Sequence, residues 1–395
     1  MSLQDENRQT ENTNGVITSD PKTRPKTYRA YDFGLLILTV FLVGLGLVFL
    51  YSSSSYTATQ KFGNAAFYLK RQAGFAVFGI LFMVIVSLID YKIYIVKWPI
   101  YGFRLIYGLY ALSLVLQALV LVVGEDIYGA KRWIDIPKIG SFQPSEVTKI
   151  CAIIFTAFIC YSAPKKMNRF GGFLRVMVYM ALPILLVAKE DLSTGLVIAG
   201  IVFLICFVTS KKWLYFIGMI IMGAGSVVAY IFLGNKFRAE RIEGWLNVDT
   251  SSAGYQIRRG LYAIASGGIK GKGLGESSMK LGYVPESHND MIFSIICEEM
   301  GIIGAICIIF LFAVLIWRIY IVAFNAPDLF GSLICIGVMA HIAIQVVMNI
   351  AVVTSVIPAT GIALPFISYG GSSLVMLLAE MGMVLSVSYH IKNVE

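Results

Sequence analysis

The sequence predicts an all-α polytopic membrane protein with about ten transmembrane helices. Of the 395 residues, 57% are hydrophobic and only 14% are charged, and the mean hydropathy is +0.77. Soluble domains carry about 25% charged residues. Apolar runs long enough to cross a bilayer recur along the chain. These runs are continuous rather than alternating, which excludes a transmembrane β-barrel.

We expect one membrane domain, residues 31–392, after a polar tail, residues 1–30, that is predicted to be disordered and cytoplasmic. The eighth span is over-long, so it is tilted or begins outside the hydrocarbon. One long extracellular loop, residues 235–289, separates the seventh and eighth spans. The ten spans lie at about 33–53, 73–89, 103–124, 145–163, 173–189, 192–209, 213–234, 290–322, 329–352 and 370–390.

Basic residues predict the orientation. The N-terminal tail and the short loops after the second, fourth and sixth spans carry Lys or Arg, which marks their side as the cytoplasm and places both termini there. The loop 235–289 is also basic, against this trend, and an anionic ligand at the outer surface would account for it. The net charge of +9 therefore points to lipid headgroups. Nucleic acid is disfavoured because no soluble basic domain is evident.

Asp290 is the main catalytic candidate. It ends the polar segment PESHND, residues 285–290, immediately before an apolar run. An ionisable group at the mouth of a membrane helix is costly, so it is a functional candidate by default. Partial desolvation would raise its pKa toward that of a useful general base. The alternative is a helix N-terminal cap, but Glu286 and His288 add two more titratable groups than a cap requires.

Four further charged residues are expected on the same side of the membrane. Glu146 and Lys149 are three residues apart and share a helix face. They form either a self-satisfied structural ion pair or part of a polar cavity that receives a headgroup. Arg132 beside Trp133 is equally consistent with anchoring at the membrane interface. Asp191 is equally consistent with capping the sixth span.

Two glycine-containing segments are also candidates. In Ser266–Gly275, backbone N–H groups with Lys270 and Lys272 could cradle a phosphate, although a plain flexible loop is the alternative. The segment lacks the ending of a nucleotide-binding P-loop. The segment Asn349–Ser373 interrupts an apolar region with Pro and Gly, which predicts either the wall of a substrate groove or close helix packing. We expect the intramembrane acids Glu298, Glu299 and Glu380 to be structural partners.

These motifs resemble the SEDS family (shape, elongation, division and sporulation), the polytopic peptidoglycan glycosyltransferases of bacteria. The resemblance covers about residues 33–390, and the PESHND form is more similar to the division member than to the elongation member, with a sporulation member as the alternative. The turn Glu190–Thr194 lacks the proline and glycine that are usual in the family. The matching motifs are GAKRWI at 129–134, FQPSEVTK at 142–149, GYQIRRGLYAIASGGIKGKGLG at 254–275, PESHNDMIFSIICEEMG at 285–301 and NIAVVTSVIPATGIALPFISYGGSSL at 349–374.

The resemblance implies polymerisation of lipid II at the outer face of the bacterial cytoplasmic membrane, in division or cell-shape growth. The donor sugar is α-linked and the product β-linked, so the transfer inverts and needs one base, which falls on Asp290. The pyrophosphate leaving group needs positive charge rather than a second carboxylic acid. The implied substrate-binding residues are Arg132, Glu146, Lys149, Asp191, Arg258, Lys270, Lys272, Glu286, His288, Ser368 and Ser372.

The implied partners are a class B penicillin-binding transpeptidase and other divisome or elongasome membrane proteins. A divalent cation, Mg²⁺ or Mn²⁺, near Asp290 would be compatible with the chemistry. Two other functions use the same residues. A lipid II flippase predicts polar groups through the full depth of the bundle, whereas the inner halves of the spans are mostly apolar. A non-catalytic divisome scaffold predicts that Asp290→Asn leaves activity in cells intact.

Overall fold

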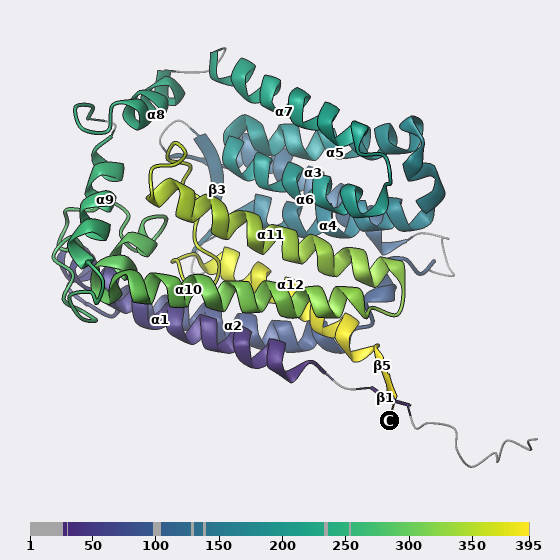
Figure 1. Cartoon of the computed structure of the whole chain (residues 1–395), viewed down its shortest axis with the longest axis horizontal. Coiled ribbons are helices and arrows are strands. Elements are labelled where there is room, and N and C mark those ends of the chain that lie inside the picture. Colours follow the sequence, from purple (N-terminus) through teal and green to yellow (C-terminus); the bar gives the residue numbers. More distant parts are fainter. Residues whose placement is uncertain are drawn as a thin grey trace, which may run out of the picture.

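The computed structural model describes residues 27–29, 31–97, 104–127, 130–136, 140–232, 236–252 and 254–394. Long helices run side by side through the molecule (Figure 1). They are α1 (Phe33–Phe62), α2 (Phe67–Leu88), α3 (Leu105–Val123), α4 (Pro144–Ser162), α5 (Phe170–Glu190), α6 (Leu192–Thr209), α7 (Leu214–Phe232), α10 (Ile292–Phe324), α11 (Leu329–Val353) and α12 (Gly371–Tyr389).

The predicted polytopic α-helical fold is confirmed. Within the described part of the chain, nine of these helices, α1 to α6 and α10 to α12, are long and apolar enough to cross a membrane. The expected span 213–234 corresponds to α7. Helix α1 continues well past the predicted end at residue 53 and stops at Gly63, whose left-handed backbone (φ 66°) and N–H bond to the carbonyl of Thr59 form a C-terminal cap.

Helices α4 and α12 form the centre of the bundle, since 78% of the apolar stretch of each is buried, against 22% for α3 and 28% for α5. Glycines allow α2 and α12 to approach closely. A Cβ atom added at Gly382 of α12 would lie 2.6 Å from the carbonyl oxygen of Met83, and one at Gly79 of α2 would lie 2.6 Å from Leu378 Cδ1. Small residues at such crossings are typical of membrane helix packing.

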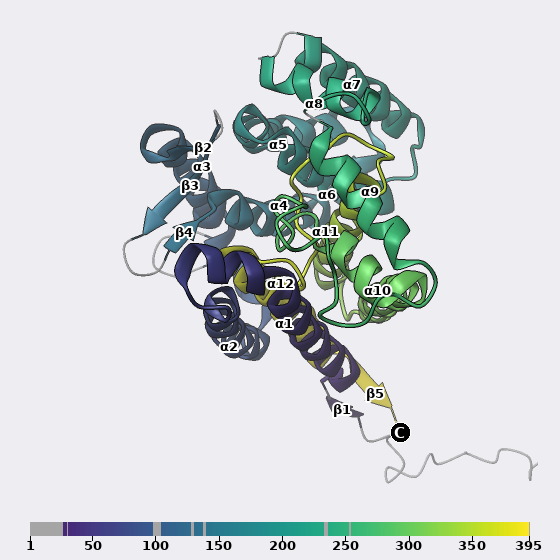
Figure 2. The same cartoon turned by 90° about the vertical axis from the view of Figure 1, so that its left-hand side faces the viewer.

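Most of the irregular structure collects at one end of the bundle, called here the cavity end (Figure 2). The expected loop 235–289 is not a simple loop, because it contains α8 (Lys236–Leu246) and α9 (Tyr255–Gly267). The connection 125–144 forms a small antiparallel sheet of β2 (Glu125–Ile127), β3 (Ala130–Ile136) and β4 (Gly140–Phe142). Residues 354–370 carry no helix or strand, as their Pro and Gly content predicts.

Helix α10 is broken at Gly301, where φ is 66° and ψ is −168°. The glycine-rich segment after α9 inserts at this break. The N–H groups of Lys272 and Gly273 donate to the carbonyls of Glu298 and Glu299 at 3.0 and 2.9 Å. The over-long eighth span is therefore two helices joined at a glycine. These two N–H groups, which were candidates for a phosphate cradle, are already used to cap the first of the two helices.

The opposite end of the bundle, called here the terminal end, holds β1 and β5, the first and last elements of the described chain (Figure 1). Strand β1 (Thr27–Arg29) pairs antiparallel with β5 (Lys392–Val394). The last residues of the predicted disordered tail are thus a strand, while residues 1–26 lie outside the described residues. Two short 3₁₀ helices, η3 (Tyr91–Tyr94) and η4 (Pro164–Asn168), also lie in the short connections at this end.

Candidate functional site

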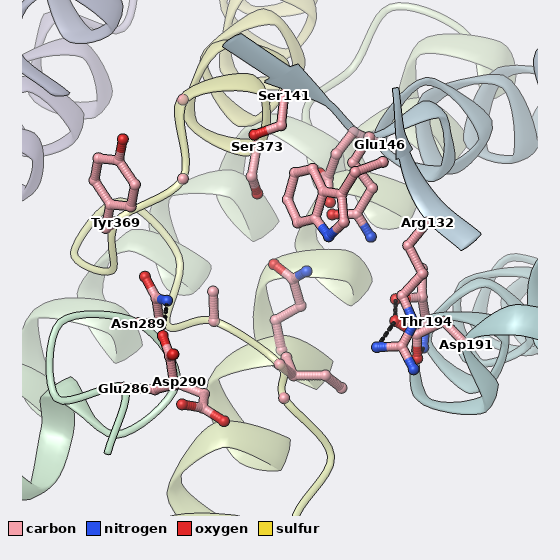
Figure 3. A pocket seen from close by; sticks show the side chains of 18 of the residues that line it. Arg132, Ser141, Glu146, Asp191, Thr194, Glu286, Asn289, Asp290, Tyr369 and Ser373 are labelled. Carbon is pink, nitrogen blue, oxygen red and sulfur yellow. Dashed lines mark hydrogen bonds and ion pairs between the residues drawn. The ribbon is translucent and has the colours of Figure 1, made fainter. Parts of the chain in front are cut away.

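A cavity of about 380 Å³ opens at the cavity end of the bundle. Its wall brings together residues from α2, β3, α4, α6, the turn before α10, α11 and the segment before α12. Figure 3 shows Glu286, Asn289 and Asp290 on one side and Arg132 and Asp191 on the other. The lining residues include Arg71, Phe75, Arg132, Trp133, Ser141, Gln143, Glu146, Lys149, Asp191, Thr194, Glu286, Asn289, Asp290, Gln345, Tyr369 and Ser373.

Asp290 lies half-buried in the turn that leads into α10. It is not the helix cap, because the N-cap position is Met291 and no side chain bonds there. The carbonyl of Glu286 accepts the N–H groups of Asn289 and Met291 at 3.0 and 3.4 Å, so the turn closes around Asp290. Glu286 itself has a left-handed backbone (φ 51°), which is uncommon for a non-glycine residue and is often found at functional sites.

Neighbouring elements hold this aspartate in place. Asn349 Nδ2 of α11 donates to the main-chain oxygen of Asp290 and to that of Ile362, both at 2.8 Å. Gln256 Nε2 of α9 donates to both carboxylate oxygens of Asp290, at 3.3 and 3.4 Å. The main chain and the carboxylate of Asp290 are therefore positioned by two different helices.

Burial raises the pKa of Asp290 to about 6, with a further upward contribution from the charge of Glu286. Its own backbone N–H, the Gln256 bond and the charge of Arg241 oppose the shift. A carboxyl group with this pKa is largely ionised at pH 7 and still basic enough to accept a proton. Burial lowers the pKa of His288, so its imidazole is neutral near pH 7.

On the opposite wall, Arg132 and Asp191 form an ion pair at 3.4 Å. Asp191 also caps α6 by accepting the N–H groups of Ser193 and Thr194 at 3.0 and 3.2 Å. The capping role and a place on the cavity wall therefore coexist. Arg132 Nε donates to the main-chain oxygen of Glu190 at 3.1 Å, which fixes β3 against the junction of α5 and α6.

Glu146 and Lys149 lie on the buried helix α4. Their side chains are 6% and 2% exposed and pair at 2.9 Å. Both also line the cavity, so the structural pair and the cavity wall are the same feature. Among the lining residues, the basic Arg71, Arg132 and Lys149 face four acidic residues, which leaves no surplus of positive charge on the wall.

Six of the predicted site residues lie outside the cavity lining. Ser368 and His288 support the turn, since Ser368 Oγ donates to the carbonyl of Asn289 at 2.7 Å and the His288 ring lies 4.5 Å from that of Tyr68. Arg258 bonds the main-chain oxygen of Val248 at 3.2 Å. Lys272 pairs with Glu298 at 2.6 Å, Lys270 is exposed, and Ser372 Oγ is buried without a partner among the described residues.

Sequence reasoning missed several residues at the site. Arg71 and Tyr369 line the cavity, and Gln256 and Asn349 bond Asp290. Arg241 of α8 lies near enough to influence the Asp290 carboxylate, and its Nη1 donates to the carbonyl of Ala359 at 3.3 Å. Gln256, Asn349 and Tyr369 had a usable signal, because they fall inside the quoted motifs at 254–275 and 349–374.

A family model described as "Cell cycle protein", for the FtsW, RodA and SpoVE proteins, matches residues 33–393. The chain belongs to this family. It is 37% identical over 382 residues to a protein of Trichlorobacter lovleyi named "Probable peptidoglycan glycosyltransferase FtsW", covering 93% of this chain and 96% of that protein. It is also 37% identical over 363 residues to stage V sporulation protein E of Bacillus subtilis, covering 90% and 96%.

Solved structures of SEDS proteins share the fold. A structure described as coordinating polymerisation and crosslinking in a peptidoglycan synthase complex matches with a TM-score of 0.75 and 29% identity, over 91% of this chain and 98% of that one. RodA of Thermus thermophilus matches with a TM-score of 0.65 and 27% identity, over 92% and 98%. The chain is thus a SEDS glycosyltransferase of peptidoglycan synthesis, and the flippase and scaffold alternatives are not favoured.

Proposed function

We propose that this SEDS protein polymerises lipid II at the outer face of the bacterial cytoplasmic membrane, with Asp290 as the general base. In this orientation the cavity end faces outward and the terminal end lies in the cytoplasm, as the basic short loops predict. The observation that carries the proposal is a half-buried carboxylate with a pKa of about 6 on the wall of a polar cavity.

The reaction is one displacement. The ionised Asp290 takes the proton of the 4-OH of the acceptor sugar, while the 4-oxygen of that sugar bonds to the anomeric carbon of the donor. The bond from that carbon to the pyrophosphate oxygen breaks on the opposite face, and polyprenyl pyrophosphate leaves with the electron pair. The proton then passes from Asp290 to water in the cavity.

Pyrophosphate recognition falls to the basic side chains of the cavity lining. Arg132 lines the cavity while paired with Asp191 at 3.4 Å, and the buried Lys149 lines it as well. Arg71 on α2 is a third cation of the lining. Charge that develops on the leaving oxygen is stabilised by such fixed cations, because they need no reorganisation during the reaction.

A divalent cation near Asp290, Mg²⁺ or Mn²⁺, remains part of our proposal. The described residues contain no group of three or more His, Cys, Asp or Glu that could hold a metal ion. No step above passes through a cation. A Mg²⁺ or Mn²⁺ ion that enters with the pyrophosphate is tested by removing divalent ions with EDTA and then restoring each of them.

The partner we propose is a class B penicillin-binding transpeptidase, together with other membrane proteins of the division or elongation machinery. The support is the likeness to a chain from a structure that describes a peptidoglycan synthase complex coordinating polymerisation and crosslinking. Co-purification of a tagged chain with the transpeptidases of its own cell tests this assignment, and nucleic acid is not an expected partner.

The deciding experiment uses purified protein in detergent with lipid II, with and without the transpeptidase, and follows strand products on a gel. Asp290→Asn is expected to abolish strand formation while thermal unfolding stays unchanged. Asp249→Asn is the matched control, because this aspartate is exposed at the same end of the molecule and outside the cavity lining. Strand synthesis by Asp290→Asn at the rate of the control variant would overturn the proposal.

A further inference from the structure

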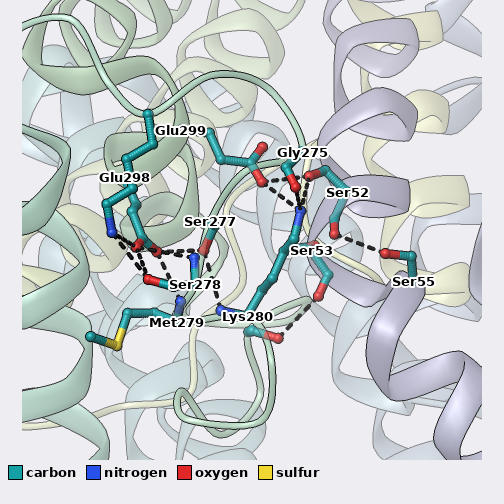
Figure 4. Close-up of polar contacts among 12 residues, drawn as sticks. Ser52, Ser53, Ser55, Gly275, Ser277, Ser278, Met279, Lys280, Glu298 and Glu299 are labelled. Atoms are coloured by element: carbon teal, nitrogen blue, oxygen red, sulfur yellow. Dashed lines mark hydrogen bonds and ion pairs between the residues drawn. The ribbon is translucent and has the colours of Figure 1, made fainter.

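A buried polar cluster joins α1 to the segment that leads to Asp290. Lys280 Nζ donates to Glu299 Oε1 at 2.9 Å, to Ser52 Oγ at 3.0 Å and to the carbonyl of Gly275 at 2.6 Å. Ser52 Oγ also donates to Glu299 Oε1 at 2.6 Å. Figure 4 shows the Lys280 ammonium beside Ser52 of α1. The side chains of Lys280 and Glu299 are 7% and 0% exposed, so this is an interior site.

A second contact pins the same segment to α1. Ser287 Oγ donates to the main-chain oxygen of Ser53 at 3.2 Å, and both residues are buried. Ser52 and Ser53 are adjacent on α1, whereas Lys280 and Ser287 are seven positions apart on the segment. Ser287 is three residues before Asp290. The approach to the catalytic turn is therefore fixed to α1 at two points.

The neighbouring acid makes a different kind of contact. Glu298 accepts bonds from Ser266 Oγ of α9 at 3.1 Å, and from Lys272 Nζ at 2.6 Å and Ser278 Oγ at 3.0 Å of the segment that follows α9 and inserts at the α10 break. Those bonds tie that segment to the first part of α10. Of these two acids, Glu299 is the one that bonds α1 among the described residues, through Ser52, and so relates the approach to the catalytic turn to that helix.

Stability alone does not account for a charge pair at this position. A buried ion pair can often be replaced by apolar residues of similar volume without loss of stability, because the desolvation penalty offsets the attraction. What an apolar replacement cannot reproduce is the directed set of bonds from one ammonium group to three elements. Reaction rates are sensitive to such placement, since a shift of about 1 Å in a catalytic group can lower the rate about 10²-fold.

We propose that Ser52, Lys280 and Glu299 are positioning residues that set the place of Asp290 relative to α1. The inference rests on the proposed role of Asp290 as base. The ammonium of Lys280 holds the segment, the carboxylate of Glu299 holds that ammonium from α10, and the hydroxyl of Ser52 brings both to α1. Misplacement of the segment then lowers the rate of the chemical step and leaves lipid II binding unchanged.

The test is the double variant K280M/E299L, which removes both charges together. We expect a midpoint of thermal unfolding near that of the unmodified chain, an unchanged KM for lipid II, and a kcat at least about tenfold lower. The matched control is D32N/R318M, which removes an ion pair of 2.6 Å at the terminal end and retains a capping side chain on α1. It is expected to keep full kcat.

A milder variant, S52A/S287A, keeps the charge pair and removes only two hydroxyl groups of the link to α1. It covers the case in which K280M/E299L does not fold, and it is expected to lower kcat about three- to tenfold at constant KM. A folded K280M/E299L or S52A/S287A with full kcat would overturn the inference. Asp290→Asn in the same assay separates the two proposals. Strand synthesis by that variant would overturn the role of Asp290 as the base, whereas full kcat in the other variants would overturn only the positioning role.

Discussion

The ionisation of Asp290 predicts a pH profile that can be worked out from the structure. A general base acts only as the carboxylate, so the rate follows its ionised fraction. With a pKa of about 6, that fraction is about 90% at pH 7, about half at pH 6 and about 10% at pH 5. An aspartate at the ordinary value of 3.8 would lose activity about two pH units lower. We therefore expect kcat/KM for lipid II to fall about fivefold between pH 6 and pH 5 and about tenfold per pH unit below that.

The variant Glu286→Gln tests whether the pKa of Asp290 is what sets the acid limb of this pH profile. The negative charge of Glu286 raises the pKa of Asp290, so its removal should move the acid limb to lower pH while Gln preserves the side-chain volume. Glu276→Gln is the matched control, because Glu276 is exposed on the same segment and outside the cavity lining. Initial rates between about pH 4.5 and 8 at constant ionic strength give the profiles. A rate that is constant down to pH 5, or a limb that Glu286→Gln leaves in place, would refute the reasoning.

Three further variants test the packing of the site by thermal unfolding in detergent. Lys149→Met leaves the buried Glu146 charge without its partner and should lower the free energy of unfolding by about 3–5 kcal/mol. The double variant with Glu146→Leu should restore most of that loss. A Lys149→Met variant as stable as the unmodified chain would contradict this expectation. Asn349→Ala removes two 2.8 Å bonds to main-chain oxygens and should cost about 1–3 kcal/mol per carbonyl left unpaired, with a lower kcat. Gly301→Ala places a Cβ atom 2.4 Å from main-chain atoms, whereas Gly268→Ala, also at positive φ, meets nothing within 4 Å, so only the first should prevent stable folding.

The sequence predicts the spans well because a bilayer requires long apolar runs, and such runs are visible in one dimension. It does not predict where helices end outside the hydrocarbon. Helix α1 continues through Ser52–Ser55 to Phe62, and the hydroxyls of Ser52, Ser53 and Ser55 bond within the bundle or to carbonyls of the helix itself. The break at Gly301 is also invisible locally, because its cause is a glycine-rich segment that comes about 30 residues earlier in the chain.

For the site, too, the sequence predicts some features and not others. Charged residues in the connections at one end of the bundle, such as Arg132, Asp191 and Asp290, share a cavity because the bundle brings those connections together. The predicted phosphate-binding lysines do not line it, since Lys272 is paired with Glu298 and Lys270 points to solvent. Nothing in the composition distinguishes a lysine that meets a ligand from one that meets a buried acid, because that choice depends on contacts distant in sequence.

The pairing of β1 with β5 constrains the number of times that the chain crosses the membrane. Hydrogen-bonded strands share a compartment, so the chain must enter and leave the bilayer on one side. A path with both ends on one side makes an even number of crossings. The nine helices that meet the length and hydropathy criteria in the described part of the chain would give an odd number, and α7, with 19 apolar-rich residues, restores parity. Compartment-specific reporters fused to the N-terminus and to the C-terminus should therefore report the same side of the membrane.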